Sequence, residues 1–273
     1  MNNKIQEQQE QELRLKENLS RIKNTFIIIS GKGGVGKTTV SVNLAYALAK
    51  KNLKVGIMDV DIHGPNIAKM LGIEGNQLTG GQWGIEPFAA LPNLKAVSMA
   101  LLNQEQDNPI IWRGPLKMAT IKQFISDVNW GELDYLIVDS PPGTGDEPLS
   151  ICQLIPDIKG AIIVTTPQDV AILDSRKTVF FARQLNIPVA GIIENMSGFI
   201  CPHCNSKTDL FGSGGGEKAA SNLSVPFLGR IPIEPEMVIH GDAGKPYAHY
   251  QRETETGKIF NTIIDKIIAF KND

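Results

Sequence analysis

The chain has 273 residues, of which 42% are hydrophobic and 21% are charged. This ordinary globular composition excludes a disordered, a collagen-like or a disulfide-framework protein. Lysine and arginine number 27 against 29 acidic residues, a net charge of −2, and this near-neutral balance gives no reason to expect nucleic-acid binding. No apolar run approaches the roughly 18–20 residues that cross a bilayer. Because the polar N-terminus does not resemble a signal peptide, we expect a cytoplasmic protein.

The first 24 residues are polar, and we expect them to form a helical arm or else a frayed terminus. From residue 25 onward, short Ile- and Val-rich runs alternate with segments of helical period, which is typical of strands buried on both faces of a parallel sheet. Strands are expected at residues 25–30, 54–59, 133–139, 160–166 and 188–194, and helices at 37–51, 115–127 and 168–185. The alternation predicts an α/β fold with a doubly wound, mainly parallel sheet and helices on both faces. We expect residues 25–273 to form one domain.

A glycine-rich loop, Gly-Lys-Gly-Gly-Val-Gly-Lys-Thr-Thr, directly follows the first expected strand. It satisfies the P-loop pattern G-x-x-x-x-G-K-[ST], with a strand before it and a helix after it. Glycines let backbone N–H groups turn inward around a phosphate, and the next helix adds the positive end of its dipole. We expect Lys37 to reach the β- and γ-phosphates and the Thr38 hydroxyl to bind Mg²⁺. The expected nucleotide-binding residues are Gly31, Lys32, Gly33, Gly34, Val35, Gly36, Lys37, Thr38 and Thr39.

A second lysine, Lys32, follows the first glycine of this loop. The form G-K-G-G-x-G-K-[ST]-T resembles the deviant Walker A motif of the MinD, ParA and nitrogenase-iron-protein group of dimeric ATPases. That resemblance implies that Lys32 reaches across a subunit interface to the nucleotide of the partner. A solvated surface lysine is the alternative.

Acidic residues follow two of the expected strand ends, where an open α/β sheet places its ligand crevice. Asp59 and Asp61 leave one strand on the same side, and Asp139 ends another before a Pro-Pro-Gly turn. The deviant Walker A resemblance implies that Asp59 and Asp139 hold Mg²⁺ through its waters and that Asp61 positions the attacking water. It also implies that Gly143 senses the γ-phosphate. A helix N-cap is the alternative role for such acids, and His63 is expected to form a local hydrogen bond.

Base recognition is expected just beyond two later strands. Asn195 matches the position at which relatives of the deviant Walker A group hydrogen-bond adenine, and Ile231 and Pro232 lie in the matching loop beyond the next strand. The chain lacks the N-K-x-D signature of guanine-binding proteins. ATP is therefore favoured over GTP.

The motif Cys201-Pro202-His203-Cys204 supplies two thiolates at the spacing that grips one metal or one cluster edge. The third cysteine, Cys152, has apolar neighbours and is expected to be a buried core thiol. Three interpretations of the CxxC motif remain: a redox dithiol, a structural zinc completed by His203 or His63, and a site completed by symmetry. In the last, two CxxC pairs meet at a two-fold axis and supply the four thiolates of a [4Fe–4S] cluster.

Together these motifs resemble the Mrp/ApbC/Nbp family of ATP-dependent iron–sulfur cluster carriers. The resemblance runs from about residue 22 to 270 and is carried by residues 30–39, 59–65, 111–115, 134–146, 194–197, 201–204 and 229–235. It implies a homodimer that bridges a [4Fe–4S] cluster between Cys201 and Cys204 of each chain. It further implies slow ATP hydrolysis, and apo iron–sulfur proteins and cluster scaffold proteins as partners, with neither nucleic acid nor membrane. Residues 1–150 contain no cysteine, so the N-terminal four-cysteine motif of eukaryotic relatives has no counterpart there.

Two other classes share some of these features. A MinD/ParA-type positioning ATPase with a structural zinc at the CxxC motif would need a membrane- or DNA-binding surface. Residues 258–271 could supply an amphipathic anchor, although a helix packed on the domain explains the same apolar stripe. A reductase like the nitrogenase iron protein would also share a cluster, but its cluster cysteines lie far apart in sequence.

Residues 78–88 are expected to form a small hairpin or an insert.

Overall fold

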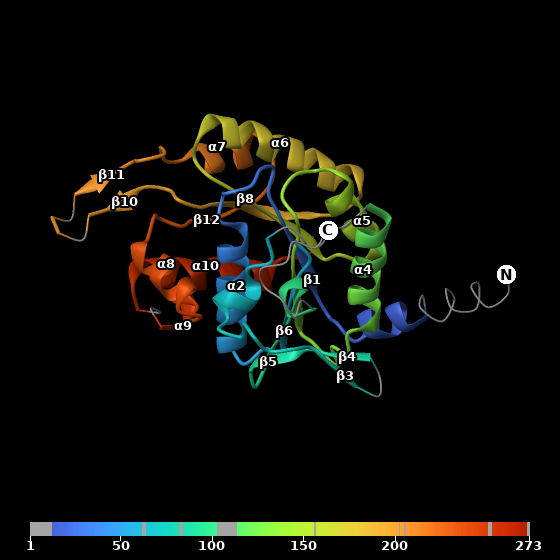
Figure 1. The fold of residues 1–273 in the computed structure, drawn as a ribbon. Coiled ribbons are helices and arrows are strands. Elements are labelled where there is room, and N and C mark those ends of the chain that lie inside the picture. The colour runs from blue at the N-terminus through green and yellow to red at the C-terminus, as the bar shows by residue number, and fades with distance from the viewer. Residues whose placement is uncertain are drawn as a thin grey trace.

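The computed structural model describes residues 13–61, 64–81, 84–102, 114–155, 157–201, 203–204, 206–250 and 253–271. Its centre is an eight-stranded sheet with the order β12-β9-β8-β1-β7-β2-β6-β5 (Figure 1). The strands are β1 (Thr25–Ile29), β2 (Val55–Asp59), β5 (Phe88–Leu91), β6 (Leu94–Ser98), β7 (Tyr135–Asp139), β8 (Gly160–Thr165), β9 (Val189–Glu194) and β12 (Phe227–Arg230). Neighbouring strands pair in parallel, except that β5 runs antiparallel to β6. This confirms the predicted mainly parallel sheet.

Helices cover both faces of the sheet (Figure 1). One face carries α2 (Lys37–Lys50), α3 (Ile67–Met70), α8 (Pro235–Asp242), α9 (Tyr247–Tyr250) and α10 (Glu255–Ala269). The other carries α4 (Gly114–Asp127), α5 (Asp146–Leu154), α6 (Asp169–Gln184) and α7 (Gly215–Asn222). A short 3₁₀ helix, η1 (Met99–Leu102), follows β6. The predicted strands and helices are therefore present, with ends that differ by at most two residues from those expected.

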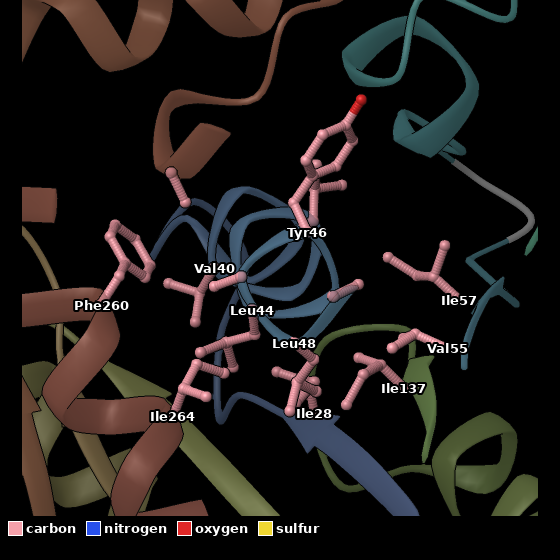
Figure 2. Close-up of a cluster of buried hydrophobic side chains, with 14 of the residues drawn as sticks. Ile28, Val40, Leu44, Tyr46, Leu48, Val55, Ile57, Ile137, Phe260 and Ile264 are labelled. Atoms are coloured by element: carbon pink, nitrogen blue, oxygen red, sulfur yellow. The ribbon is translucent and has the colours of Figure 1, made fainter. Parts of the chain in front are cut away.

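Successive residues of a buried strand pack into hydrophobic cores on opposite faces of the sheet. In β1, Ile28 packs with α2 and α10, whereas Ile27 and Ile29 face the opposite core. Figure 2 shows Leu44 and Leu48 of α2 among strand residues such as Ile28 on one side, with Phe260 and Ile264 of α10 beside the same helix. Because α2 lies between the sheet and α10, nearly all of it is buried.

Two small hairpins lie outside the central sheet. The strands β3 (Thr79–Gly81) and β4 (Gly84–Glu86) pair antiparallel, so the expectation of a hairpin within residues 78–88 is confirmed. The strands β10 (Phe199–Ile200) and β11 (Lys207–Thr208) also pair antiparallel and project from the body of the fold (Figure 1). The second hairpin carries the CxxC motif at its tip.

The described part of the N-terminal arm is helical over residues 13–20 and packs on the domain. Leu15 and Leu19 contact the core beneath α4, and the Asn18 amide donates to the Ser126 carbonyl at 2.7 Å. Residues 1–12 of the arm, His63, and the Trp-Arg pair at residues 112–113 of the family motif lie outside the described residues. These three residues anchor the described part of the arm.

The C-terminal helix α10 turns its apolar stripe inward. Phe260, Ile263, Ile264 and Ile267 are all buried, while Ile268 is 40% exposed. This confirms a helix packed on the domain and leaves no free stripe for a membrane anchor. In the part of the chain that the structure describes, we find no helix long and apolar enough to cross a membrane.

Truncating α10 on its buried side tests this packing. We expect Ile264→Ala to lower the free energy of unfolding by about 2–5 kcal/mol, because it opens a cavity between α10 and α2. Ile268→Ala, in the same helix, should change it by less than about 1 kcal/mol. Urea titrations of both variants would measure the difference. Equal losses in the two variants would mean that the stripe is not buried as described.

Candidate functional site

The P-loop joins the carboxyl end of β1 to the start of α2. Its turn needs glycine at position 36, where φ is +81°. A Cβ there would lie only 2.3 Å from the Asn195 Nδ2 atom. At the other end of the loop, a Cβ on Gly31 would lie 2.6 Å from the backbone of Asp174 in α6. The loop is thus held tightly between two neighbouring elements.

The P-loop lysine forms a buried ion pair at the end of β7. Lys37 Nζ donates to Asp139 Oδ1 at 2.8 Å, and the Thr38 hydroxyl donates to Asp139 Oδ2 at 2.7 Å. The Ser41 hydroxyl, one turn further along α2, donates to Oδ1 at 2.7 Å. Lys37 and Asp139 are both buried, and these charge-assisted bonds compensate for the loss of hydration. The sequence did not single out Ser41, although its spacing of four residues from Lys37 puts it on the same helix face.

A second buried carboxylate, Asp59, lies beside the first. Asp59 and Asp139 are register partners in the parallel strands β2 and β7. Asp59 accepts hydrogen bonds from the backbone N–H groups of Asp61 and Ile67 and from the Ser98 hydroxyl. Burial, with a further contribution from the nearby Asp139 charge, raises the pKa of Asp59 to about 7 in spite of the hydrogen bonds from Ile67 and Ser98.

The two carboxylates and Thr38 fit a magnesium ion. Carboxylate and hydroxyl oxygens are the ligands that Mg²⁺ takes, and it is commonly held through water and one or two carboxylates. The repulsion between Asp59 and Asp139 is what a divalent cation would offset. The predicted magnesium residues Thr38, Asp59 and Asp139 therefore lie together, although Asp139 also holds Lys37 in this structure.

A cleft of about 570 Å³, here called the main cleft, opens beside these groups. It is lined on one side by the P-loop from Gly33 to Thr39 and by Asp61, and on the other by mostly apolar residues of the loops after β9 and β12 and of α8. Its volume suits a nucleotide-sized ligand. Pro232 lines the cleft as expected, whereas Ile231 is fully buried and packs into the core.

Asn195 connects the far wall of the main cleft to the P-loop. Its side chain lines the cleft, and its Nδ2 donates to the Val35 carbonyl at 2.9 Å. Since that contact fixes the NH₂ group against an acceptor, the other side-chain atom is the Oδ1 acceptor. Asn195 is thus near the predicted base, but it also braces the loop that would hold the phosphates.

Two other predicted residues, Lys32 and Gly143, are not among the residues that line the main cleft. Lys32 extends its amine to 3.4 Å from Gln168 Oε1, at the start of α6. The Gly143 N–H donates to the Ser30 carbonyl at 2.7 Å, with φ at +93°. Lys32 is thus placed beside the start of α6, and Gly143 is bonded to the residue that precedes the P-loop.

The CxxC motif lies in a segment between β9 and α7, residues 197–214, here called the cysteine loop. Cys201 is half-buried, Cys204 is exposed, and both are reduced thiols. The Cys201 N–H donates to the Ser206 carbonyl at 3.0 Å, and Cys204 Sγ lies 3.0 Å from Ser206 Oγ. Hydrogen bonding with Ser206 lowers the pKa of the Cys204 thiol, with a further contribution from Cys201. Cys204 thus has more thiolate character than an ordinary cysteine.

The third cysteine has the opposite character. Cys152 is buried in α5 among apolar side chains, and burial raises the pKa of its thiol to about 12. This confirms the expected core thiol. Across the described ranges, no group of three or more His, Cys, Asp or Glu side chains is arranged to hold a metal. Within these ranges, Cys201 and Cys204 lie together on the cysteine loop, whereas Cys152 lies apart from them in the core.

The sequence matches a family of known function. Residues 21–268 fit the model of the ParA-type NUBPL iron-transfer P-loop NTPases. The iron–sulfur cluster carrier protein of Methanocaldococcus jannaschii is 53% identical over 260 residues, which cover 94% of this chain and 90% of that protein. The cytosolic Fe–S cluster assembly factor CFD1 of Kluyveromyces lactis is 45% identical over 268 residues, covering 94% of both chains.

Solved structures agree on the fold. A nucleotide-binding protein from Archaeoglobus fulgidus in complex with ADP is 36% identical and superposes with a TM-score of 0.78, covering 91% of this chain and 96% of that one. The cell division ATPase MinD of Pyrococcus furiosus is 23% identical, with a TM-score of 0.66 over 90% of this chain and 98% of its own. The P-loop, the paired strand-end carboxylates and these matches together establish that the chain belongs to the NUBPL family of iron-transfer P-loop NTPases.

Proposed function

We propose that this chain is an ATP-hydrolysing iron–sulfur cluster carrier whose [4Fe–4S] cargo is shared between two copies. The observation that carries the proposal is the pair of half-buried Cys201 and exposed Cys204, which projects on the cysteine loop of a P-loop NTPase and would supply half of a four-thiolate site. Relatives named as iron–sulfur cluster carriers and as a cytosolic assembly factor support the same role. Apo iron–sulfur proteins and scaffold proteins in the cytoplasm would then be its partners.

The sharing of the cluster follows from the number of thiolates. A [4Fe–4S] cluster takes four cysteine ligands, and Cys152 is buried in the core. An isologous dimer supplies the second pair without any further sequence. Exposed apolar side chains near the motif support such a contact: Leu210 is 57% exposed and Ile200 is 36% exposed. A second copy would remove both from water.

The position of Lys32 supports the same dimer. Its amine lies near Gln168 at the start of α6, where Val170 and Leu173 of the first helical turns are both well exposed. Lys32 does not line the main cleft of its own chain, and the exposed apolar side chains near it are suited to contact with a second copy. Lys32 would then add its charge to the partner's phosphates.

ATP hydrolysis is assigned to the main cleft. Lys37 would bind the β- and γ-phosphates, and Asp61, which also lines the cleft, would orient the attacking water. Thr38, Asp59 and Asp139 would hold Mg²⁺, which when bound neutralises phosphate charge. The Asn195 Oδ1 acceptor suits the amino group of adenine better than the carbonyl of guanine, which favours ATP.

The alternative of a MinD/ParA-type positioning ATPase with a structural zinc has less support. The apolar stripe of α10 is buried, and His203 forms no three-residue metal group with the cysteines among the described residues.

Removing the P-loop amine tests the nucleotide site. Lys37→Ala should weaken ATP binding by about 10–100-fold, the equivalent of one or two lost charged hydrogen bonds. Lys69→Ala is the matched control, because Lys69 lines the same cleft but pairs with Glu74 at 3.5 Å. Calorimetric titration with ATP–Mg would compare the two. Unchanged affinity in a folded Lys37→Ala protein would remove Lys37 from the phosphate site.

The role of Asp61 separates turnover from binding. Asp61→Asn should slow ATP hydrolysis by about 10²–10⁴-fold while ATP affinity stays within a few-fold, because water activation contributes to the transition state. Asp242→Asn, in another acid that lines the cleft, should leave turnover nearly unchanged. Phosphate release and nucleotide titration would be measured on the same samples. Loss of binding together with turnover would instead assign Asp61 to loop structure.

Cysteine variants test the cluster site. Protein reconstituted anaerobically with iron and sulfide should hold about four irons per dimer. Cys201→Ala and Cys204→Ala should each lose the visible cluster absorbance while ATP affinity is retained, whereas Cys152→Ala should keep the cluster. A cluster that survives Cys201→Ala would contradict the proposed ligands, and loss of the cluster only in Cys152→Ala would move the site to α5.

A further inference from the structure

A buried carboxylate that the nucleotide chemistry does not use lies at the end of β9. Glu194 is fully buried. It accepts hydrogen bonds from the Ser197 hydroxyl at 2.5 Å, from the Gly214 N–H at 2.8 Å and from the Gly216 N–H. The Arg230 guanidinium is 3.7 Å away. A buried polar group left without hydrogen-bond partners is costly, so this cluster fixes the groups around Glu194.

The donors to Glu194 come from both ends of the cysteine loop. Ser197 is where the chain leaves the sheet, and Gly214 is where it returns and begins α7. Gly216 adds a backbone N–H from the first turn of that helix, where such groups lack partners within the helix. One carboxylate therefore fastens both roots of the segment that carries Cys201 and Cys204.

Further backbone contacts tie the same roots to the wall of the main cleft. The Ser197 N–H donates to the Ile231 carbonyl at 2.9 Å, and the Ile233 N–H donates to the Gly198 carbonyl at 2.8 Å. Pro232, between these two residues, lines the main cleft. The base of the cysteine loop is thus continuous with the wall that faces a bound nucleotide.

The residue next to Glu194 holds the P-loop itself. Asn195 donates to the Val35 carbonyl, and a Cβ on Gly36 would lie 2.3 Å from the same amide nitrogen. The P-loop and Asn195 therefore have almost no clearance between them. Glu194, at the end of the buried strand β9, therefore contacts the roots of the cysteine loop, and the next residue, Asn195, contacts the phosphate loop.

We propose that Glu194 is a positioning residue that, with Asn195, couples nucleotide binding at the P-loop to the exposure of Cys201 and Cys204. A bound nucleotide restricts the motion of the P-loop. Because Asn195 contacts that loop, the neighbouring roots of the cysteine loop, which Glu194 holds, also become less mobile. The cysteine loop then opens less often and its thiols are less accessible. The nucleotide site belongs to the proposed function, but the thiol response requires no bound cluster.

The test measures thiol accessibility in the cluster-free, reduced full chain. Each thiol is labelled with iodoacetamide with and without saturating ADP–Mg, and mass spectrometry follows Cys201 and Cys204 separately. For the unaltered chain we expect ADP–Mg to slow labelling of both by at least about fivefold, the lower end of typical coupling between sites. Cys152, buried in the core, serves as an internal reference that stays unlabelled while the protein is folded.

Glu194→Gln isolates the link. The amide NH₂ of glutamine cannot accept from a backbone N–H group, so either Gly214 or Gly216 loses its acceptor and the anchor of the returning root is weakened. We expect the ADP effect on labelling to fall below about twofold while ADP affinity stays within about threefold. Glu217→Gln is the matched control, because Glu217 is an exposed acid that pairs with the same Arg230. It should keep the full ADP response.

Ser197→Ala provides a milder variant in case Glu194→Gln does not fold. It removes one donor to Glu194 and should reduce the ADP response without abolishing it. If the unaltered chain binds ADP but its thiols are labelled at an unchanged rate, the coupling is overturned while the nucleotide site stands. A full ADP response in Glu194→Gln would overturn the coupling in the same way. Absence of ADP binding would overturn the proposed nucleotide function and the link together, whereas failure to reconstitute a cluster would leave the thiol response as a separate result.

Discussion

The buried pair of Lys37 and Asp139 is the interaction on which the arrangement of the site depends. A buried ion pair is costly to break, because removal of one partner leaves an uncompensated charge. Here the pair joins the start of α2 to the end of β7, with Thr38 and Ser41 as further donors. It fixes the phosphate loop over two adjacent carboxylates, and parallel register places Asp59 beside Asp139. The sheet thus collects the charged groups that nucleotide and metal chemistry require.

The same sheet edge connects two kinds of chemistry. The central strands hold the phosphate loop and the paired acids. Strand β9, which β1 and β8 separate from β7 in the sheet, ends at Glu194, and Asn195 follows directly. From that end the cysteine loop leaves the body and carries thiols of unlike environment: Cys201 is half-buried and Cys204 is exposed with a lowered pKa. An accessible thiol such as Cys204 would suit the proposed cargo, which must be passed on. An enclosed structural metal would instead need ligands that surround it.

Much of this could be predicted from the sequence because the decisive signals are local. The P-loop is a contiguous motif, and Asp59 and Asp139 each end an apolar run that could only be a buried strand. Contacts between distant segments were not predictable in the same way. Ser98 lies 39 residues from Asp59, and no periodicity indicates that their side chains meet. The antiparallel edge strand β5 was missed for a similar reason, since its residues are only partly buried.

The role of Asn195 shows where resemblance and geometry differ. A family motif predicted contact with adenine, whereas the structure adds a hydrogen bond to the Val35 carbonyl 160 residues earlier in the chain. Glu194 belongs to the family motif at residues 194–197, but the sequence indicated no role for it, because an acid at a strand end also suits a helix cap. Its donors at Gly214 and Gly216 became visible only when the fold brought both roots of the cysteine loop together.

Native mass spectrometry of the anaerobically reconstituted protein tests the central claim most directly, because it weighs the intact assembly and its inorganic cargo together. We expect a species of two chains with one [4Fe–4S] cluster, and single chains that carry none. A monomer that retains a complete cluster, or a dimer with one cluster on each chain, would contradict a cargo shared between two half-sites.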